Sequence, residues 1–287
     1  MSRRPVTPTV GDQITGRLTE FALTTAAREM VSRFVQAEQQ PALPLLLEVL
    51  ELEAQERHER RITRLRRASK LPPGKTFATL DEGRLPPPLV RRLHELAEGD
   101  FLDDATNVLA FGLPGVGKSH AMCAVGHALV ERGHAVLFMP TYSLVQELLA
   151  AKRTLELPRA LRKLDHFAVL ILDDVGYIQQ SPEEAEILFT LLAERYERRS
   201  VFITSNLIFA HWDRIFRDQM ATAAAIDRLV HHSVLLEFDV PSFRTEHATR
   251  RGKATPRQAA APTSLPAKRG ETRSPREISV QGGEVRD

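Results

Sequence analysis

The sequence predicts an α/β fold in which a parallel β-sheet is covered by helices on both faces. Between residues 107 and 239, short apolar runs alternate with longer amphipathic segments. The runs are apolar at successive positions, which is typical of strands buried on both faces. A glycine-rich segment, GLPGVGKS, directly follows the first run. Parallel strands need long crossover connections, and the amphipathic segments supply them.

The chain before this alternation predicts a flexible start and a small helical domain. Residues 1–18 are polar and contain two prolines and two glycines, so we expect order to begin only after them. Residues 19–36 have apolar side chains at helical spacing, and a second helix is expected from Pro44 to about Lys70. Two prolines and a glycine at 72–74 mark the domain boundary. The expected parts are a flexible N-terminus (1–18), a helical domain (19–71), an α/β domain (72–244) and a disordered basic tail (245–287).

The second expected helix changes character halfway along its length. Its first half carries an apolar stripe, which we expect to be packed. Its second half carries seven basic side chains, which either contact nucleic-acid phosphates or form a solvated helix face. Only His58 is aromatic there, so stacking on single-stranded bases is not indicated. The stripe consists of Leu45, Leu46, Val49 and Leu52, and the basic set of Arg57, Arg60, Arg61, Arg64, Arg66, Arg67 and Lys70.

The larger domain supplies the strands and helices of the sheet. Thr141 is expected to cap the helix that follows it. Ser181, Pro182 and Glu184 combine an N-cap, a first-turn proline and a capping box. The strands are expected at 107–112, 135–139, 168–174, 200–206 and 233–239, and the helices between them at 119–131, 142–153, 155–166 and 182–199.

Composition and charge narrow the class of protein. Of the 287 residues 43% are apolar, and the net charge is +2. Residues 81–243 carry 16 basic and 23 acidic side chains, whereas 1–80 carry 13 and 9, and 244–287 carry 10 and 5. A polyanion such as DNA would therefore meet the flanks, unless these are merely solvated. Because Cys123 is the only cysteine and no apolar run approaches the roughly 18 residues of a membrane span, we expect a soluble, cytoplasmic protein.

The segment GLPGVGKS fits the phosphate-binding pattern G-x-x-x-x-G-K-[ST]. Its glycines allow successive backbone N–H groups to point at one phosphate chain, and the following helix adds its positive end. Lys118 is expected to reach the β- and γ-phosphates of ATP, and Ser119 to ligate Mg²⁺. The alternative is a glycine turn with an incidental lysine. The residues expected to bind the nucleotide are Gly112, Pro114, Gly115, Val116, Gly117, Lys118, Ser119 and His120.

Two further strand ends carry polar side chains suited to ATP hydrolysis. The run AVLILDD ends in two acids, of which Asp173 is expected to hold Mg²⁺ with Ser119 and Asp174 to polarise the attacking water. In ITSN, Asn206 ends a strand and is expected to hold that water near the γ-phosphate. Each feature alone would suit a solvated turn. Their order after the phosphate-binding loop favours a site that hydrolyses a nucleotide.

With these elements in order, the chain resembles the AAA+ ATPases and, within them, the IstB-like helpers of insertion-sequence transposition, which are related to DnaC-type helicase loaders. The resemblance runs from about Leu23 to Arg244 and includes NVLAFGLPGVGKSHA, LILDDVGYIQ, AERYERRS, TSN, AAIDRLVHH and PSFR. It implies a five-stranded sheet ordered 5-1-4-3-2, a small helical N-terminal domain and little or no lid domain. Many AAA+ proteins have Asp-Glu in place of Asp173-Asp174, so hydrolysis is expected and its rate is left open.

The resemblance also implies roles for residues outside the phosphate-binding loop. Arg228, in AAIDRL, matches the arginine finger that one subunit offers to the γ-phosphate held by its neighbour. The alternative is an exposed arginine paired with a nearby aspartate. Arg244 matches a nucleotide sensor, or it is simply the last ordered residue. Thr76 and Phe77 lie where the linker of the family borders the adenine, or they plug the joint between domains.

Taken together, the resemblance implies an ATPase that uses ATP and Mg²⁺ and forms a ring or a helical homo-oligomer. DNA and oligomerisation would stimulate its turnover. It would engage target duplex DNA and recruit or stimulate the transposase of the same insertion element. The alternative, from another class, is an adaptor like the DnaC loaders, in which the helical domain grips a replicative helicase. A metabolic kinase is not expected, because no site for a substrate hydroxyl is evident.

Overall fold

The computed structural model describes residues 8–176, 181–212, 215 and 219–242. Each predicted strand is confirmed to within one residue at either end. The predicted tail and Arg244 lie outside the described residues. The helices discussed below are α1 (Val10–Glu20), α2 (Thr24–Gln36), α3 (Leu43–Ala68), α4 (Pro87–Glu98), α5 (Lys118–Glu131), α6 (Thr141–Arg153), α7 (Leu157–Leu164), α8 (Pro182–Arg195) and α10 (Gln219–Val230). The strands are β1 (Asn107–Gly112), β2 (Val136–Pro140), β3 (Val169–Val175), β4 (Ser200–Ser205) and β5 (Ser233–Phe238).

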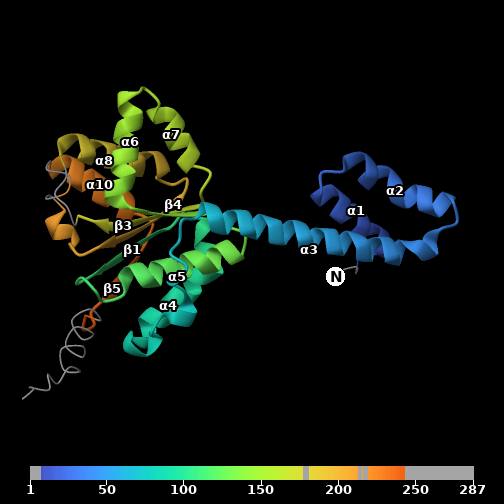
Figure 1. The fold of residues 1–287 in the computed structure, drawn as a ribbon, viewed down its shortest axis with the longest axis horizontal. Helices are drawn as coiled ribbons and strands as arrows, with labels where there is room; N and C mark the ends of the chain where they lie inside the picture. Colours follow the sequence, from blue (N-terminus) through green and yellow to red (C-terminus); the bar gives the residue numbers. More distant parts are fainter. Residues whose placement is uncertain (1–7, 177–180, 213–214, 216–218, 243–287) are drawn as a thin grey trace, which may run out of the picture. The chain divides into compact units, whose positions relative to one another are not determined.

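The five strands form one parallel sheet in the order β2-β3-β4-β1-β5 (Figure 1). This confirms the predicted order 5-1-4-3-2, read from the opposite side. β1 lies between β4 and β5, and β3 lies next to β4. Because all the strands run in the same direction, the segments that follow β1, β3 and β4 leave the sheet at one edge, the carboxyl edge, where parallel sheets place their ligands.

Helices cover both faces of the sheet, as expected for strands that are apolar throughout. Figure 1 shows α4 and α5 on one face and α6, α7, α8 and α10 on the other. Neighbouring strand residues point to opposite faces and so enter different cores. Val108 and Ile171 pack in the cluster that includes residues of α4 and α5, whereas Leu109 and Leu170 pack with those of α6, α7, α8 and α10. The sheet is therefore the middle of three layers.

A helix, α1, occupies much of the segment that was expected to be flexible. The Thr9 hydroxyl accepts a hydrogen bond from the Asp12 N–H (3.2 Å), and the Asp12 carboxylate accepts one from the Thr9 N–H (2.9 Å). Ile14 and Leu18, one turn apart, are buried. The prediction that order begins near Thr19 is therefore wrong, because a capping box and one apolar pair define a helix once neighbouring helices cover it.

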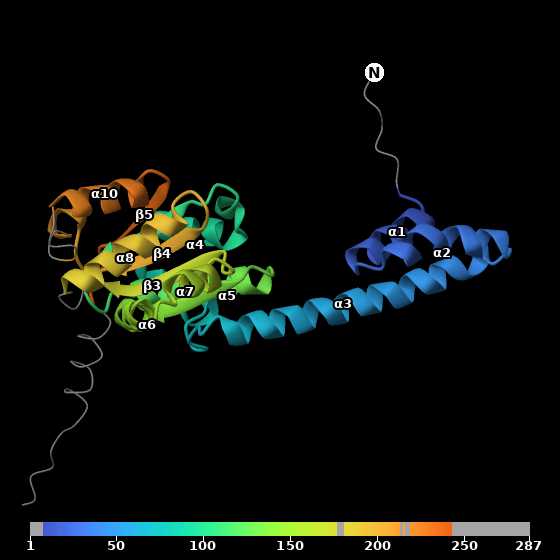
Figure 2. The same cartoon turned by 90° about the horizontal axis from the view of Figure 1, so that it is seen from above.

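Helix α3 is one uninterrupted helix, as predicted (Figure 2), but of the expected apolar stripe Leu46 packs in the core and the other three residues are exposed. Leu45, Val49 and Leu52 are 64%, 53% and 63% exposed. The run LPLLLEVL carries two overlapping stripes at helical spacing, and the sequence alone does not decide which one is buried. α1, α2 and α3 share a small core of their own, and the domain boundary near residue 72 stays a prediction. That core contains Ile14, Leu18 and Leu43, with Leu46, Leu47 and Leu50 packed against it.

Two local features near the sheet differ from expectation. α4 was not predicted, although Leu89, Leu93 and Leu96 follow three prolines at helical spacing and are all buried. Thr141 does not cap α6; its hydroxyl instead donates to the backbone oxygen of Asp173 (2.8 Å). A threonine side chain forms whichever backbone bond lies within reach, and here that bond joins two neighbouring strands.

Helix α8 begins with the predicted capping box of Ser181 and Glu184 and ends at Arg195, four residues earlier than expected. The Arg195 side chain is 1% exposed. Its guanidinium donates to the backbone oxygens of Leu164 (3.0 Å) and Phe167 (3.0 Å), and to that of Ser200 (3.1 Å). Burial lowers the pKa of Arg195 to about 10, which still leaves it charged at neutral pH. Arg195 thus joins the end of α8 to the starts of β3 and β4.

Replacing Arg195 with methionine, which keeps the length and removes the donors, is expected to lower the free energy of unfolding by about 2–5 kcal/mol. Buried carbonyl oxygens would then be left without donors. Urea unfolding measures this difference. The matched control is Arg159→Met, because Arg159 is exposed and forms only a 3.3 Å surface pair with Glu156; its expected effect is below about 1 kcal/mol. Equal effects of the two substitutions would contradict a structural role for Arg195.

Candidate functional site

The loop between β1 and α5 has the backbone that phosphate binding requires. Gly115 and Gly117 have φ of +83° and +101°, a region that residues with a Cβ rarely adopt. A Cβ at Gly112 would lie 2.5 Å from the backbone oxygen of Phe238 on the neighbouring strand β5. Gly117 then serves as the N-cap residue of α5, so the N–H groups of the first helical turn are left facing the loop.

Lys118 lies across this loop, where a phosphate chain would be bound. Its side chain is 6% exposed, and its ammonium donates to the backbone oxygens of Gly112 (2.7 Å) and Leu113 (2.9 Å). The Lys118 ammonium is therefore held beside the glycine-rich loop, which we call the glycine cradle. The cradle, the cation and the helix N-terminus together fit the polyphosphate of ATP, and Ser119 follows Lys118 at the start of α5.

The two acids lie at the end of β3, and a threonine on β4 holds both of them. Asp173 is 9% exposed, and its Oδ1 accepts a hydrogen bond from the Thr204 hydroxyl (2.6 Å). The same hydroxyl accepts a bond from the Asp174 N–H (2.9 Å). Asp174 is exposed, and its φ of +58° accompanies an irregularity in the pairing of β3 with β4. Such backbone strain is concentrated at functional sites.

Thr204 is a site residue that was not predicted. It is completely buried on β4, and its hydroxyl donates to the Asp173 carboxylate and accepts from the Asp174 N–H. The signal was present in the sequence: a threonine ends the apolar run VFI just before SN. With Thr141, the first residue of α6 after β2, bonded to the backbone oxygen of Asp173, the acid pair is held from the sides of both neighbouring strands, β2 and β4.

The structure brings most of the predicted residues to one edge of the sheet. The phosphate-binding loop follows β1, the acids end β3, and Asn206 follows β4 with its side chain exposed. Because β4 lies between β3 and β1, Asn206 leaves the sheet between the acids and the loop. A nucleotide bound at the loop would thus face the carboxylates that suit Mg²⁺ and a polar group that suits a water molecule.

Comparison with known proteins identifies the family. The profile of the family "IstB-like ATP binding protein" matches residues 15–251. The chain belongs to this family. An insertion-sequence ATP-binding protein of Sinorhizobium fredii is 43% identical over 228 residues, 79% of this chain and 76% of that protein. The insertion sequence IS21 ATP-binding protein of Pseudomonas aeruginosa is 39% identical over 199 residues, 69% of this chain and 75% of that one.

Solved structures support the fold of this IstB-like protein. AMPPCP-bound DnaA from Aquifex aeolicus matches with a TM-score of 0.51 and 17% identity, over 64% of this chain. The match spans only 56% of that DnaA chain. At this identity the likeness concerns the AAA+ fold alone, which confirms the predicted fold class. Among the described residues, no helix is long and apolar enough to cross a membrane.

Arg228 of the IstB-like protein does not lie at the edge that carries the loop. It is near the end of α10, shortly before β5 begins, and therefore lies toward the amino edge of the parallel sheet. Its guanidinium carbon lies 4.9 Å from the centre of the Phe189 ring on α8. Its Nη1 is buried and makes no hydrogen bond to any described residue. Arg228 thus lies toward the opposite end of the strands from its own phosphate-binding loop.

The basic segment of α3 divides into two groups. Four of its side chains contact the protein: Arg57 pairs with Glu53, Arg60 with Glu56, Arg61 with the backbone oxygen of Gly133, and Arg66 with Glu131. The other three, Arg64, Arg67 and Lys70, are exposed, and no ion pair binds them within the described part of the chain. The second group keeps its charge available for a partner.

Phe77 packs on α4 and so bears on the role predicted for the linker. Its ring stacks on His94, with ring centres 4.6 Å apart and an angle of 18° between the planes. His94 is in turn 2.9 Å from a carboxylate oxygen of Glu82. Phe77 thus packs on α4, within the expected α/β domain, and both the adenine role and the plug between domains stay predictions. Deep in the same layer, burial raises the pKa of the Cys123 thiol to about 12, so this cysteine is not a nucleophile.

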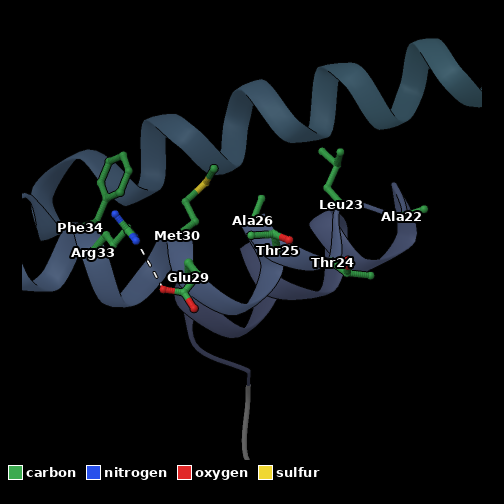
Figure 3. A pocket seen from close by; sticks show the side chains of 9 residues that line it. All are labelled: Ala22, Leu23, Thr24, Thr25, Ala26, Glu29, Met30, Arg33 and Phe34. Carbon is green, nitrogen blue, oxygen red and sulfur yellow. Dashed lines mark ion pairs between the residues drawn. The ribbon is translucent and has the colours of Figure 1, made fainter.

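A separate pocket lies on α2 and contains none of the predicted nucleotide-binding residues. Figure 3 shows Leu23, Met30 and Phe34 extending from α2 toward a second helix, while the ion pair of Glu29 and Arg33 lies at the rim. The lining is largely apolar and has no glycine-rich backbone. It is not suited to a triphosphate.

Proposed function

We propose that this IstB-like protein hydrolyses ATP as an oligomer on duplex DNA and assists transposition by recruiting or stimulating a separate transposase. The observation that carries the proposal is the separation of Arg228 from its own nucleotide site. The names of the relatives place them in insertion sequences, and a DNA-binding ATPase is a function that such an element would use. A role in which ATP is only bound, without turnover, would not need the acid pair held by Thr204.

The nucleotide site would act by electrostatic preorganisation, with charged side chains already positioned around the phosphates. Lys118 binds the β- and γ-phosphates in place of its two backbone carbonyls. Ser119 and Asp173 hold Mg²⁺, which neutralises phosphate charge when it is bound. Asp174, exposed beside Asp173, accepts a proton from the attacking water, and Asn206 orients that water. Thr204 is a positioning residue for both acids.

Arg228 would complete the site of a neighbouring copy. A finger must reach the γ-phosphate, and Arg228 lies toward the opposite end of the strands from the loop of its own chain. Arg228 is only partly exposed, and its Nη1 makes no hydrogen bond to any described residue; a buried donor is costly unless a partner satisfies it. A γ-phosphate presented by a second copy would supply acceptor oxygens. ATP would then favour assembly, and hydrolysis would favour its release.

Duplex DNA would be bound through the charges on α3 that the protein itself leaves available. Arg64 and Arg67 are three residues apart on α3 and so share a face, and Lys70 follows the helix end. Exposed arginine and lysine side chains contact mainly DNA phosphates. We therefore expect the affinity for duplex DNA to depend strongly on salt concentration and little on base sequence.

Substituting Arg64 and Arg67 together with glutamine is expected to weaken duplex binding and to reduce the salt slope of log affinity by about 2, since each phosphate contact contributes roughly 0.9. Fluorescence anisotropy of labelled duplex at several salt concentrations measures the slope. The matched control replaces Arg28 and Arg33, both 74% exposed on α2, and should leave the slope unchanged. An unchanged slope in the Arg64 and Arg67 variant would place the DNA contact elsewhere.

The whole proposal is tested by strand-transfer assays with the transposase of the same element. We expect the protein to raise transposase activity only when DNA and ATP are both present. If the transposase works equally well without it, and the protein instead forms a stable complex with a replicative helicase, the adaptor interpretation replaces this one.

A further inference from the structure

Helix α5 begins at the nucleotide site and is bonded along its length to the segment that leads back to α3. Its sequence is KSHAMCAVGHALVE, so that beyond Lys118 and Ser119 only three side chains are polar or charged: His120, His127 and Glu131. They are spaced by seven and four residues, which puts them on one face of the helix. All three bond to residues between Arg66 and Thr79.

The contacts of these three side chains are specific. His120 Nε2 lies 3.2 Å from the backbone oxygen of Thr76 and 3.0 Å from the Thr79 hydroxyl. His127 Nε2 lies 3.0 Å from the backbone oxygen of Pro72. A carbonyl oxygen only accepts, so both imidazoles donate from Nε2. Glu131 accepts two hydrogen bonds from the Arg66 guanidinium, of which the Nε bond is 2.7 Å. We call His120, His127 and Glu131 the α5 clasp.

Packing keeps this segment close to α5 between the three bonds. A Cβ at Gly126 would lie 3.1 Å from a Leu71 methyl and 2.9 Å from an Ile171 methyl, so a larger residue would push these side chains away from α5. The backbone oxygen of Ser69 accepts a bond from the Phe138 N–H of β2 (2.7 Å). At the far end of α5, Arg61 of α3 donates to the backbone oxygen of Gly133 (3.0 Å). The segment therefore has little freedom to move without α5.

The opposite end of α5 would change partners on binding a nucleotide. Lys118 donates to two carbonyl oxygens of the loop, and phosphate oxygens would replace these acceptors. His120 lies in the same helical turn as Lys118. A helix buried against a sheet transmits a shift of its first turn as a unit, because its length is fixed by its internal hydrogen bonds. Coupling between the two sites requires that the contacts of α5 differ between the nucleotide-free and the nucleotide-bound protein.

We propose that the α5 clasp couples the phosphate-binding loop to the basic end of α3, so that ATP sets the affinity for duplex DNA through His120, His127 and Glu131. This rests on the proposed function, since it presupposes that both ligands bind. In this proposal the three side chains are positioning residues. His120, which was expected to bind the nucleotide, bonds instead to the backbone oxygen of Thr76 and to the Thr79 hydroxyl. Arg66 is the α3 partner of Glu131 in the clasp and is not part of the DNA contact. Couplings between two sites in one protein commonly change an affinity by about 5- to 150-fold.

The test measures one ratio, the duplex affinity with a non-hydrolysable ATP analogue divided by the affinity without it. Arg66→Glu and Glu131→Arg each place like charges together, and the double variant Arg66→Glu/Glu131→Arg restores an opposite pair. His127→Ala removes one clasp bond from the middle of the helix. Because the ratio compares the same variant in two states, a general change in charge on α3 cancels. Thermal unfolding of each variant shows whether it is folded.

We expect a wild-type ratio of about 5 or more. The ratio should fall at least threefold in His127→Ala and in both single charge variants, and the charge swap should recover most of the loss. His232→Ala, an exposed histidine on the turn before β5, is the matched control and should keep the full ratio. If His127→Ala fails to fold, the two single charge variants and the double variant still test the proposal. Arg66 and Glu131 are about half exposed, so substitutions there are expected to leave the protein folded.

Failure of the proposal differs from failure of the proposed function. A wild-type ratio of one means that ATP does not control DNA binding, which removes the proposed function and the coupling with it. A wild-type ratio well above one that persists in every clasp variant overturns the clasp alone. A loss in the single charge variants without recovery in the swap would also overturn it, because the ion pair would then not be what matters.

Discussion

Replacing Arg228 with alanine is expected to lower DNA-stimulated ATP turnover by about 10³-fold or more, because an arginine finger stabilises the charge that develops on the transferred phosphoryl group. The affinity of the loop for ATP should change little, since Arg228 lies away from the loop of its own chain. Steady-state turnover and equilibrium binding of a fluorescent ATP analogue measure the two quantities separately.

Arg228→Lys is the informative companion to the alanine variant. Lysine keeps the positive charge and the contact with the Phe189 ring, now 4.9 Å from the guanidinium carbon, but it lacks the planar fork of donors. If Arg228 served only to pack on Phe189, the lysine variant would be fully active. We expect it to remain far below the wild type. Full turnover in Arg228→Ala would exclude the finger.

Replacing Asp174 with asparagine is expected to lower ATP turnover by about 10²-fold or more, the usual contribution of a positioned proton acceptor. ATP should still bind, because Lys118 and the glycine cradle are untouched. Asparagine suits this position because it tolerates a left-handed backbone, here with φ of +58°. The loss would therefore reflect the missing carboxylate and not a strained turn.

The matched control for Asp174 is Asp103→Asn, which removes an exposed acid from a turn outside the site. Its turnover should equal that of the wild type. Thermal unfolding should show Asp174→Asn to be as stable as the wild type. Turnover that is unchanged by Asp174→Asn would mean that another group accepts the proton, and the role given to the second acid would be withdrawn.

The sheet and the phosphate-binding loop were predictable because their signals are local. A strand buried on both faces is apolar at every position, so β1 and β3 stand out in the sequence. The loop needs glycine where φ is positive, as at Gly115 and Gly117, and no other residue type serves as well. The strand order came from the resemblance to the AAA+ ATPases, since periodicity alone does not show which strands are neighbours.

The features that were missed depend on contacts between distant parts of the chain. Thr204 matters because β4 lies beside β3, and a threonine in a strand otherwise only suits the strand. Leu45 is exposed because α1 covers another face of α3. Arg66 is bonded to Glu131, 65 residues further along the chain. In the sequence, it could not be told apart from Arg64 or Arg67.

The central claim is that one active site is built from two copies of the chain, and subunit mixing tests it most directly. Lys118→Ala keeps Arg228 but loses the phosphate-binding cation, while Arg228→Ala keeps the nucleotide site but loses the finger. Each variant alone should be nearly inactive on duplex DNA. In an equal mixture, random assembly should restore about one quarter of the wild-type turnover, because intact sites then face intact fingers. A mixture no more active than the sum of its parts would contradict a shared site.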